Sequence, residues 1–191
     1  MKKNLVSAVL MTVATTILLG IVYPLVVTGL AQVFFPAKAN GQLIEVNGKI
    51  IGSRILGQAF TGAGYFHSRP SAVAYDPTNT NGSQLGPTNQ KLIDRVKGDV
   101  SSLQAENPNT PIPVDMVTTS ASGLDPEITP AAAAFQIHRV AAARRVTDAE
   151  IAHAVSEHTL GRTLGILGEP RVNVLELNLA LDAKYPSGGG H

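Results

Sequence analysis

The longest pattern in the chain is an uninterrupted apolar run near the N-terminus. Residues 5–35 form 31 consecutive positions without Asp, Glu, Lys or Arg, and 17 of them are Leu, Ile, Val or Phe. An α-helix rises about 1.5 Å per residue, so roughly 20 such residues span the hydrocarbon core of a bilayer. The run therefore predicts a transmembrane helix over residues 5–35, preceded by a short N-terminal segment, residues 1–4.

A cleaved secretory signal is the alternative interpretation of this run. Lys2 and Lys3 precede it, and residues 37–39 (Ala-Lys-Ala) imitate a cleavage site. The apolar region of a signal peptide is only about 7 to 15 residues long, however, which is about half of this one. Basic residues are denser on the N-terminal side of the span, which favours a cytoplasmic N-terminus. We therefore expect a membrane anchor whose following domain, residues 36–186, lies outside the cytoplasmic membrane.

The span also contains residues that suit packing against other helices. Small and hydroxyl-bearing side chains let helix backbones approach closely, and a proline kinks a helix by removing a backbone donor. An anchor that touches only membrane lipid is the alternative. The candidate packing residues are Thr12, Thr16, Gly20, Pro24 and Thr28.

Shorter alternating runs and a long polar stretch follow the span. Two β-prone runs, residues 43–46 and 49–51, flank Asn47-Gly48, a pair that suits the positive φ angles of a type I′ turn and predicts a hairpin. Residues 54–60 are expected to form another short strand. In residues 61–90, 17 of 30 positions are Gly, Pro, Ser, Thr or Asn, which predicts a long loop that serves as an ordered contact surface.

Apolar spacing and capping residues predict helices in the second half of the chain. Apolar residues from Leu92 to Leu103 recur at helical spacing, so one face of this helix is expected to pack on the core. Thr129, Thr147 and Asn173 have the residue types and positions of N-caps. The helices that they open are expected over residues 130–145, where three arginines suit the C-terminal end of the helix dipole, 148–158 and 174–184.

These elements define the expected fold class. Residues 111–117 contain two prolines and predict an extended edge strand. The soluble part is therefore expected to be one α+β domain, a mixed α/β arrangement with a small sheet and about three to four helices over residues 36–186. The Ser-Gly-Gly-Gly-His end, residues 187–191, is expected to be a flexible tail.

Composition and motifs narrow the range of functions. Fifteen Lys and Arg against 14 Asp and Glu give no strong field, which argues against nucleic acid as a partner. There is no Cys, no hydrolase nucleophile elbow and no phosphate-binding loop, and His153 and His158 lack the spacing of metal ligands on one helix face. We predict no catalytic residues and no metal site. A membrane-tethered hydrolase using Ser122 or Asp125 and a solute-binding domain remain as alternatives.

Five unusual strings are required neither by a core nor by a simple linker. Together with the N-terminal span they resemble, in order, the C subunit of the Kdp potassium-transporting P-type ATPase. The strings are YFHSRPSA (65–72), GSQLGPTN (82–89), PVDMVT (113–118), SASGLDP (120–126) and GEPRVNVLELNLALD (168–182).

The resemblance implies a non-catalytic accessory subunit of a bacterial inner-membrane complex for high-affinity, ATP-driven potassium uptake. Its partners would be a channel-like A subunit and an ATP-hydrolysing B subunit, and its single span would hold the domain in the periplasm. The family is also described as a catalytic chaperone that raises the ATP affinity of the B subunit. No firmly bound cofactor is implied, although ATP could act through the B subunit.

The resemblance also suggests candidate contact residues. Gly82, Ser83 and Gln84 are the nearest match to a nucleotide-binding signature, but Asn81-Gly82 departs from its Ser-Gly-Gly pattern. Because ATP is cytoplasmic and these residues should lie outside, coupling through the membrane helices is the easier route. Partner contacts are expected in the loop over residues 65–89 and the turn over residues 120–126, with an arginine as polar anchor and aromatic residues as apolar anchors. The candidates are Tyr65, Phe66, His67, Arg69, Ser122 and Asp125.

Overall fold

A computed structural model describes residues 1–186 of the 191-residue chain, so the predicted tail at residues 187–191 lies outside the described residues. The chain divides into two compact units, the first ending at Ser53 and the second beginning at Arg54. The division predicted at residue 36, between the span and the soluble domain, stays a prediction.

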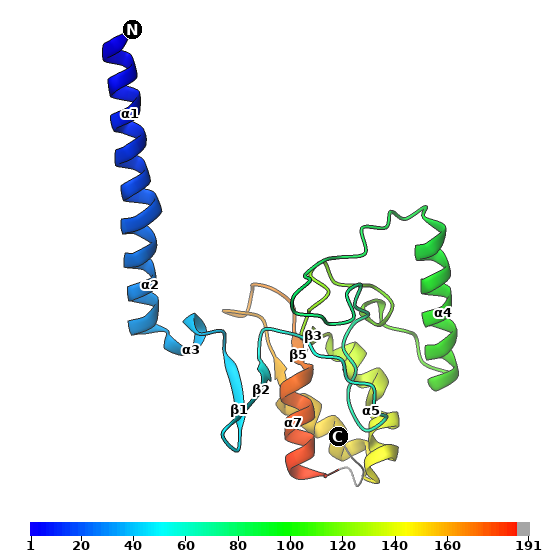
Figure 1. The fold of residues 1–191 in the computed structure, drawn as a ribbon. Helices are drawn as coiled ribbons and strands as arrows, with labels where there is room; N and C mark the ends of the chain where they lie inside the picture. The colour runs from blue at the N-terminus through cyan, green and yellow to red at the C-terminus, as the bar shows by residue number, and fades with distance from the viewer. Residues whose placement is uncertain (187–191) are drawn as a thin grey trace. The chain divides into compact units, whose positions relative to one another are not determined.

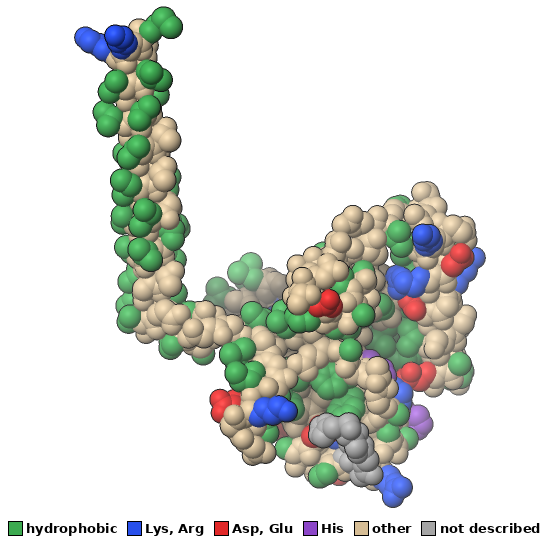
Figure 2. Space-filling view, viewed as in Figure 1, with side chains coloured by type: hydrophobic (Ala, Val, Ile, Leu, Met, Phe, Trp, Pro, Cys, Tyr) green, Lys and Arg blue, Asp and Glu red, His purple; other side chains and the backbone are tan. Residues whose placement is uncertain are grey.

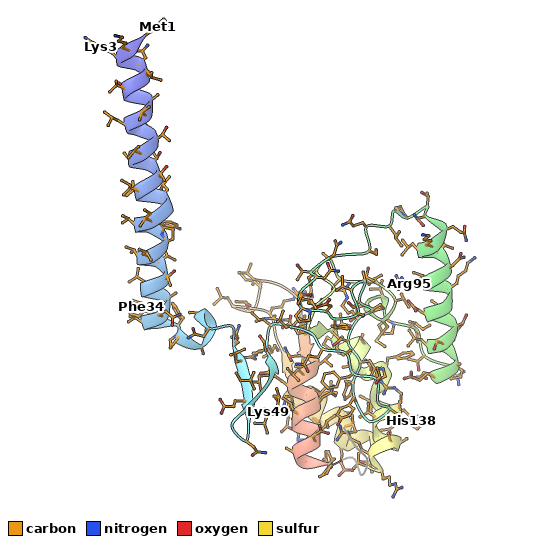
Figure 3. All side chains as sticks on the ribbon, viewed as in Figure 1. Met1, Lys3, Phe34, Lys49, Arg95 and His138 are labelled. Atoms are coloured by element: carbon orange, nitrogen blue, oxygen red, sulfur yellow. The ribbon has the colours of Figure 1, made fainter. Side chains whose placement is uncertain are left out.

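One long helical rod dominates the first unit. It runs through α1 (Lys2–Ile17), the π-helical segment η1 (Leu18–Val22) and α2 (Tyr23–Phe34), with Lys3 near one end and Phe34 at the other (Figure 3). Within residues 1–186 it is the one helix long and apolar enough to cross a membrane. Apolar side chains cover it along its length (Figure 2), and none is buried in the unit. The predicted helix over residues 5–35 is confirmed to within a turn at each end.

The π-helical segment lies directly before Pro24. Proline has no N–H to donate and its ring crowds the carbonyl group four residues earlier, which here is that of Gly20. Widening the turn over Leu18–Val22 changes the hydrogen-bond spacing at this point. The disturbance expected at Pro24 takes the form of this wider turn, and the ribbon continues through it without a break (Figure 1).

The rest of the first unit is a short helix and a hairpin. The helix α3 (Pro36–Ala39) precedes β1 (Leu43–Val46), which pairs antiparallel with β2 (Lys49–Ser53). Asn47 and Gly48 at the turn have φ angles of 52° and 77°, as a type I′ turn requires. The predicted hairpin is confirmed.

The second unit is built around three helices and a small antiparallel sheet. The helices are α5 (Pro130–Arg144), α6 (Asp148–Glu157) and α7 (Val174–Lys184). The sheet has the order β3-β5-β4, formed by Glu127–Ile128, Arg171–Asn173 and Thr159–Leu160. Together with the hairpin this is the mixed α/β arrangement predicted. The largest core side chains are Phe66, Met116, Ile128, Phe135, Val140, Ile151, Val172, Leu177 and Leu181.

Each of these three helices begins at the residue that the sequence predicts. The Thr129 side chain accepts from the amide of Ala132, and that of Asn173 accepts from the amide of Glu176. Thr147 and Glu150 form a complete capping box. Satisfied N-terminal amides fix where the helices start, and the core residues above decide which faces they bury.

The helix α4 (Gln90–Glu106) forms as predicted but packs less than expected. It contains no buried residue, and of its side chains Leu103 is the one that packs against the core. Arg95 instead ties it to the neighbouring loop by donating to the carbonyl of Val117 at 3.1 Å. In Figure 1, α4 (green) stands at the side of the unit.

Two predicted strands are absent. Residues 54–60 form a turn and an irregular segment, in which the Gly57 amide donates to the carbonyl of Leu124 and the Arg54 carbonyl accepts from the Asn173 side chain. Within residues 111–117 the chain forms a 3₁₀ turn, η2 (Val114–Met116). A strand would place Asp115 and Met116 on opposite faces, whereas both are buried here.

The buried Asp115 stabilises the start of α5. Its carboxylate accepts from the amide of Thr129 at 2.8 Å and from the Thr129 hydroxyl at 3.2 Å. The same hydroxyl accepts from the amide of Ala132, so the carboxylate orients the N-cap itself. The sequence favoured an edge-strand role for this residue, and the structure corrects it.

We predict that Asp115→Ala lowers the stability of the full chain by about 1–3 kcal/mol, because it leaves the partly buried Thr129 amide without its acceptor. Thermal unfolding in mild detergent, followed by circular dichroism, measures the loss. Asp94→Ala, on the exposed side of α4, is the control and should change the melting temperature little. Equal effects of the two substitutions would contradict the capping role.

Candidate partner-binding site

Two loops that are distant in sequence meet at Arg69. Its guanidinium contacts Asp125 Oδ2 at 3.1 Å, the Thr118 hydroxyl at 3.3 Å and the Thr118 carbonyl at 3.4 Å. The other carboxylate oxygen of Asp125 accepts from the amide of Glu127 at 3.0 Å, so Asp125 also closes its own turn. The ion pair is about one-quarter exposed, which leaves it at the surface but well fixed. The structure thus brings together two predicted contact residues.

Ser71 and Gly123 form a second contact between the same two loops. The Ser71 hydroxyl donates to the carbonyl of Gly123 at 2.6 Å and accepts from the amides of Val73 and Tyr75. Gly123 has a φ of +70°, and a Cβ there would lie 2.6 Å from the Val73 side chain. Only glycine fits this position.

Tyr75 completes the contact between the loops. Its hydroxyl donates to the carbonyl of Arg69, and burial raises the pKa of the phenol above its ordinary value. We call the set of Arg69, Ser71, Tyr75, Gly123 and Asp125 the loop junction.

Two buried amide side chains fasten the preceding backbone to the helices. Asn178 on α7 accepts from the amide of Phe66 at 2.8 Å and donates to its carbonyl at 3.0 Å. Gln136 on α5 does the same for His67, at 2.8 Å and 3.1 Å. Each side-chain amide therefore bonds to both the backbone N–H and the backbone C=O of one residue, as a neighbouring strand would. Residues 66 and 67 themselves are not in a strand.

Two arginines of α5 hold the segment before Phe66. The wholly buried side chain of Arg144 donates to the carbonyl of Gly64 at 2.6 Å and pairs with Asp182 at 2.8 Å. Arg139 donates to the carbonyls of Ala63 and Tyr65. Sequence reasoning assigned these arginines to the helix dipole and missed their role, because nothing local indicates which distant carbonyl groups they reach.

The three aromatic candidates before Arg69 have different environments. Phe66 is completely buried in the core, so the partner contact predicted for it does not fit the structure. Tyr65 is partly exposed, but its ring lies under the Arg144 guanidinium and its hydroxyl donates to Asp182. His67 is partly buried, and its Nε2 donates to the carbonyl of Gly62 at 3.0 Å. Their shared role in the free chain is to hold the loop.

Ser122 is the most accessible of the candidates in the turn. It is exposed, and its hydroxyl accepts from the amide of Leu124 at 3.1 Å. The Asp125 carboxylate is engaged by Arg69, and the Ser122 hydroxyl is bonded within its own turn. This geometry supports a structural turn with an exposed tip.

The nucleotide candidates lie beside the same turn. A Cβ on Gly82 would lie 3.1 Å from the carbonyl oxygen of Ala121. Gln84 is exposed with a φ of 53°, and its side-chain amide donates to Asn81 at 2.8 Å. Ser83 accepts weakly from the amide of Leu85 at 3.5 Å. These residues thus border the turn at Ala121, where Gln84 is exposed and Gly82 and Ser83 are partly buried.

A cleft of about 320 Å³ opens next to the loop junction. Its wall contains two acid–arginine pairs, Arg69 with Asp125 and Arg171 with Glu127 at 2.9 Å, together with Asp115 and Glu169, so acidic side chains outnumber basic ones in this lining. Over residues 1–186, His, Asp and Glu side chains form no group of three or more that could hold a metal ion.

The helix-packing candidates lie on the surface of the rod. Thr12, Thr16, Gly20, Pro24 and Thr28 follow one another at intervals of four residues, so they form a slowly turning stripe. The Thr12 hydroxyl donates to the carbonyl of Ala8 at 2.9 Å, which satisfies it within the helix. Their contact with other helices stays a prediction.

The environment of His67 makes the stability of this region depend on pH. Burial, and next the Arg139 guanidinium, lower the pKa of His67 below its usual 6.5. His67 therefore takes up a proton at a higher pH in the unfolded chain than in the folded chain. The folded state loses stability as the pH falls through 6.5 toward the folded pKa. Above that range the effect is absent.

We predict that His67→Gln gains stability relative to the unmodified chain as the pH is lowered from about 8 to about 5. Thermal unfolding of both proteins across this range measures the change in their difference. His153→Gln, at an exposed position on α6, is the control and should show a much smaller trend. A difference for His67→Gln that is independent of pH would contradict the assignment.

Comparison of the sequence with known proteins identifies the family of this chain. The family model for the c chain of the K⁺-transporting ATPase matches residues 5–183. A potassium-transporting ATPase KdpC subunit from Koribacter versatilis is 65% identical, over 97% of each chain. Those from Rhodopseudomonas palustris and Methylobacterium nodulans are each 52% identical, covering 96% and 95% of this chain and 99% and 98% of their own lengths. The chain belongs to the KdpC family of potassium-transporting ATPase subunits.

Proposed function

We propose that this chain is the accessory subunit that stabilises a high-affinity, ATP-driven potassium uptake complex in a bacterial inner membrane. Its rod crosses the membrane once with the N-terminus in the cytoplasm, and its second unit lies in the periplasm. Its partners are a channel-like A subunit and an ATP-hydrolysing B subunit. Family membership and the spanning helix support this assignment.

The loop junction is the observation that carries the proposal. Hydrogen bonds, an ion pair and a glycine that tolerates no side chain fix two loops that have little regular structure of their own. Such a surface loses little conformational entropy when it binds, which favours specific docking on a partner. We assign two contacts to a partner subunit: the exposed Ser122 in the neighbouring turn and the Arg69–Asp125 pair, which is about one-quarter exposed.

The subunit raises the ATP affinity of the B subunit by coupling through the membrane. The rod carries a stripe of Thr12, Thr16, Gly20 and Thr28, interrupted by Pro24, on which another helix can pack closely. Packing that differs between two states of the catalytic subunit would shift the balance between them. Direct contact of Gln84 with nucleotide is less favoured, because its side chain is already bonded to Asn81 and the second unit lies on the side away from cytoplasmic ATP.

A substitution at the exposed tip tests the docking role. Ser122→Trp adds bulk where there is open solvent in the free chain, and we expect it to reduce recovery of the A and B subunits with the tagged chain about tenfold or more, which corresponds to at least about 1.4 kcal/mol. Potassium-stimulated ATPase activity should fall in parallel.

The matched control is Ser102→Trp, at an exposed serine on α4. Both variants should insert in the membrane and unfold at temperatures close to that of the unmodified chain. Full recovery of the complex with Ser122→Trp would rule out the turn as a contact. Failure of the unmodified chain to co-purify with either subunit would overturn the proposed function itself.

Orientation has its own test, because the chain has no cysteine. We predict that Ser102→Cys is labelled by a membrane-impermeant maleimide added to intact spheroplasts, since α4 belongs to the unit assigned to the periplasm. A cysteine placed at Lys3, at the other end of the span, should react only after the membrane is permeabilised. The reverse pattern would show the opposite topology.

A further inference from the structure

The loop between β4 and β5 exposes large apolar side chains to solvent. Leu164 is 85% exposed, Ile166 74% and Leu167 57%. In Figure 1 this loop, coloured orange, projects from the sheet of the second unit. Single exposed apolar residues are common on protein surfaces, whereas three gathered at the tip of one loop indicate a binding surface.

The tip is an ordered turn and not a loose segment. The amide of Ile166 donates to the carbonyl of Thr163 at 3.3 Å, and Thr163 and Leu167 bond to each other in both directions at 2.8 Å and 2.9 Å. Leu164 and Gly165, the two central residues, have φ angles of 55° and 78°. This is the type I′ geometry, in which the first central position favours Asn, Asp or Gly and a leucine is unfavourable.

An ion pair closes the base of the loop. Arg162 Nη2 contacts both carboxylate oxygens of Glu169, at 2.9 Å and 2.7 Å. The apolar tip between them carries no charged residue from Thr163 to Gly168. We call residues Leu164, Ile166 and Leu167 the apolar tip.

The small size of the apolar tip points to a partner that is already held nearby. A stable interface between two free proteins buries about 1,200–2,000 Å², far more than three side chains can supply. A second copy of this chain bound through the tip alone would therefore be unstable. A partner held by the spanning helix is different, because the tip then binds at a high effective concentration and a small contact is enough.

The chemistry of the apolar tip favours protein over lipid. Segments that bind at a membrane interface combine apolar residues with Trp, Phe, Lys or Arg, and residues Thr163 to Gly168 contain none of these. A rigid turn that presents aliphatic side chains in one fixed arrangement suits a preformed apolar pocket.

We propose that the apolar tip inserts into an apolar pocket on another subunit of the same ATPase, one that the spanning helix already contacts. This contact is additional to the one that we assign to the loop junction. The proposal rests on the proposed function. The side chain of Leu164 fills that pocket, which offsets the unfavourable backbone conformation of leucine at this turn position.

Leu164→Asn separates the two effects of this residue. Asparagine suits the turn, so the variant chain alone in detergent should melt at the same or a higher temperature than the unmodified chain. Its complex with co-expressed A and B subunits should nevertheless be weaker, with recovery after a detergent wash reduced about fivefold or more. Stability and binding thus change in opposite directions, which a merely structural leucine could not produce.

Val114→Asn is the matched control, since Val114 is also an exposed aliphatic residue, at 71%, on a different element. It should leave recovery of the complex unchanged. Unchanged recovery with Leu164→Asn, or an equal loss with both variants, overturns the proposal. Because the unmodified chain is measured alongside, a failure of the proposed function appears separately as absence of the complex in every sample.

A unique cysteine identifies what covers the apolar tip. Leu164→Cys labelled with a benzophenone maleimide should crosslink to the A or B subunit on illumination of the assembled complex. Ser102→Cys, carrying the same label on α4, should not. Crosslinks from position 164 only to lipid, or only to a second copy of the chain, would overturn the proposal.

Discussion

The second unit depends on the bonds that buried polar side chains make with the backbone of residues 63–67. Gln136 and Asn178, both almost wholly buried, pair with the amide and carbonyl groups of His67 and Phe66. Arg144 satisfies the Gly64 carbonyl. Without these partners a backbone that crosses the core would carry unsatisfied polar groups, each costing about 1–3 kcal/mol. Side chains of α5 and α7 thus supply the hydrogen bonds that a neighbouring strand would otherwise provide, and these bonds keep the loop ordered.

The same arrangement explains how a polar segment with so many small residues becomes a defined surface. Phe66 is fixed in the core, so Arg69 lies only three residues from a rigid point and meets Asp125 with little freedom to move. Ser71 and Gly123 then lock the second contact. This surface is ordered without helices or strands of its own. Its exposed parts are Ser122 and the edge of the ion pair, which are the contacts that we propose for a partner subunit.

The two proposed contacts differ in their chemistry. The loop junction offers polar groups and a fixed shape, whereas the apolar tip offers hydrophobic area that water leaves on binding. In this proposal the apolar helix makes both contacts effective, because a helix held in the membrane beside its partners raises the effective concentration at which each contact forms. A subunit of this kind needs no large interface on its soluble part. The chain belongs to the KdpC family of potassium-transporting ATPase subunits, and the two contacts are proposed within that assignment.

The sequence by itself determined the elements whose signals are local. A charge-free run of 31 residues predicts the long apolar helix from composition alone. Asn47-Gly48 sets the hairpin, and Thr129, Thr147 and Asn173 set the starts of three helices, because each of these effects acts within a few residues. Tertiary structure alone decided that residues 111–117 turn so that Asp115 caps α5, that Phe66 is buried and that Arg139 and Arg144 bind distant carbonyl groups. Those outcomes depend on which backbone groups the fold leaves without partners, and no spacing along the chain reveals which groups these will be.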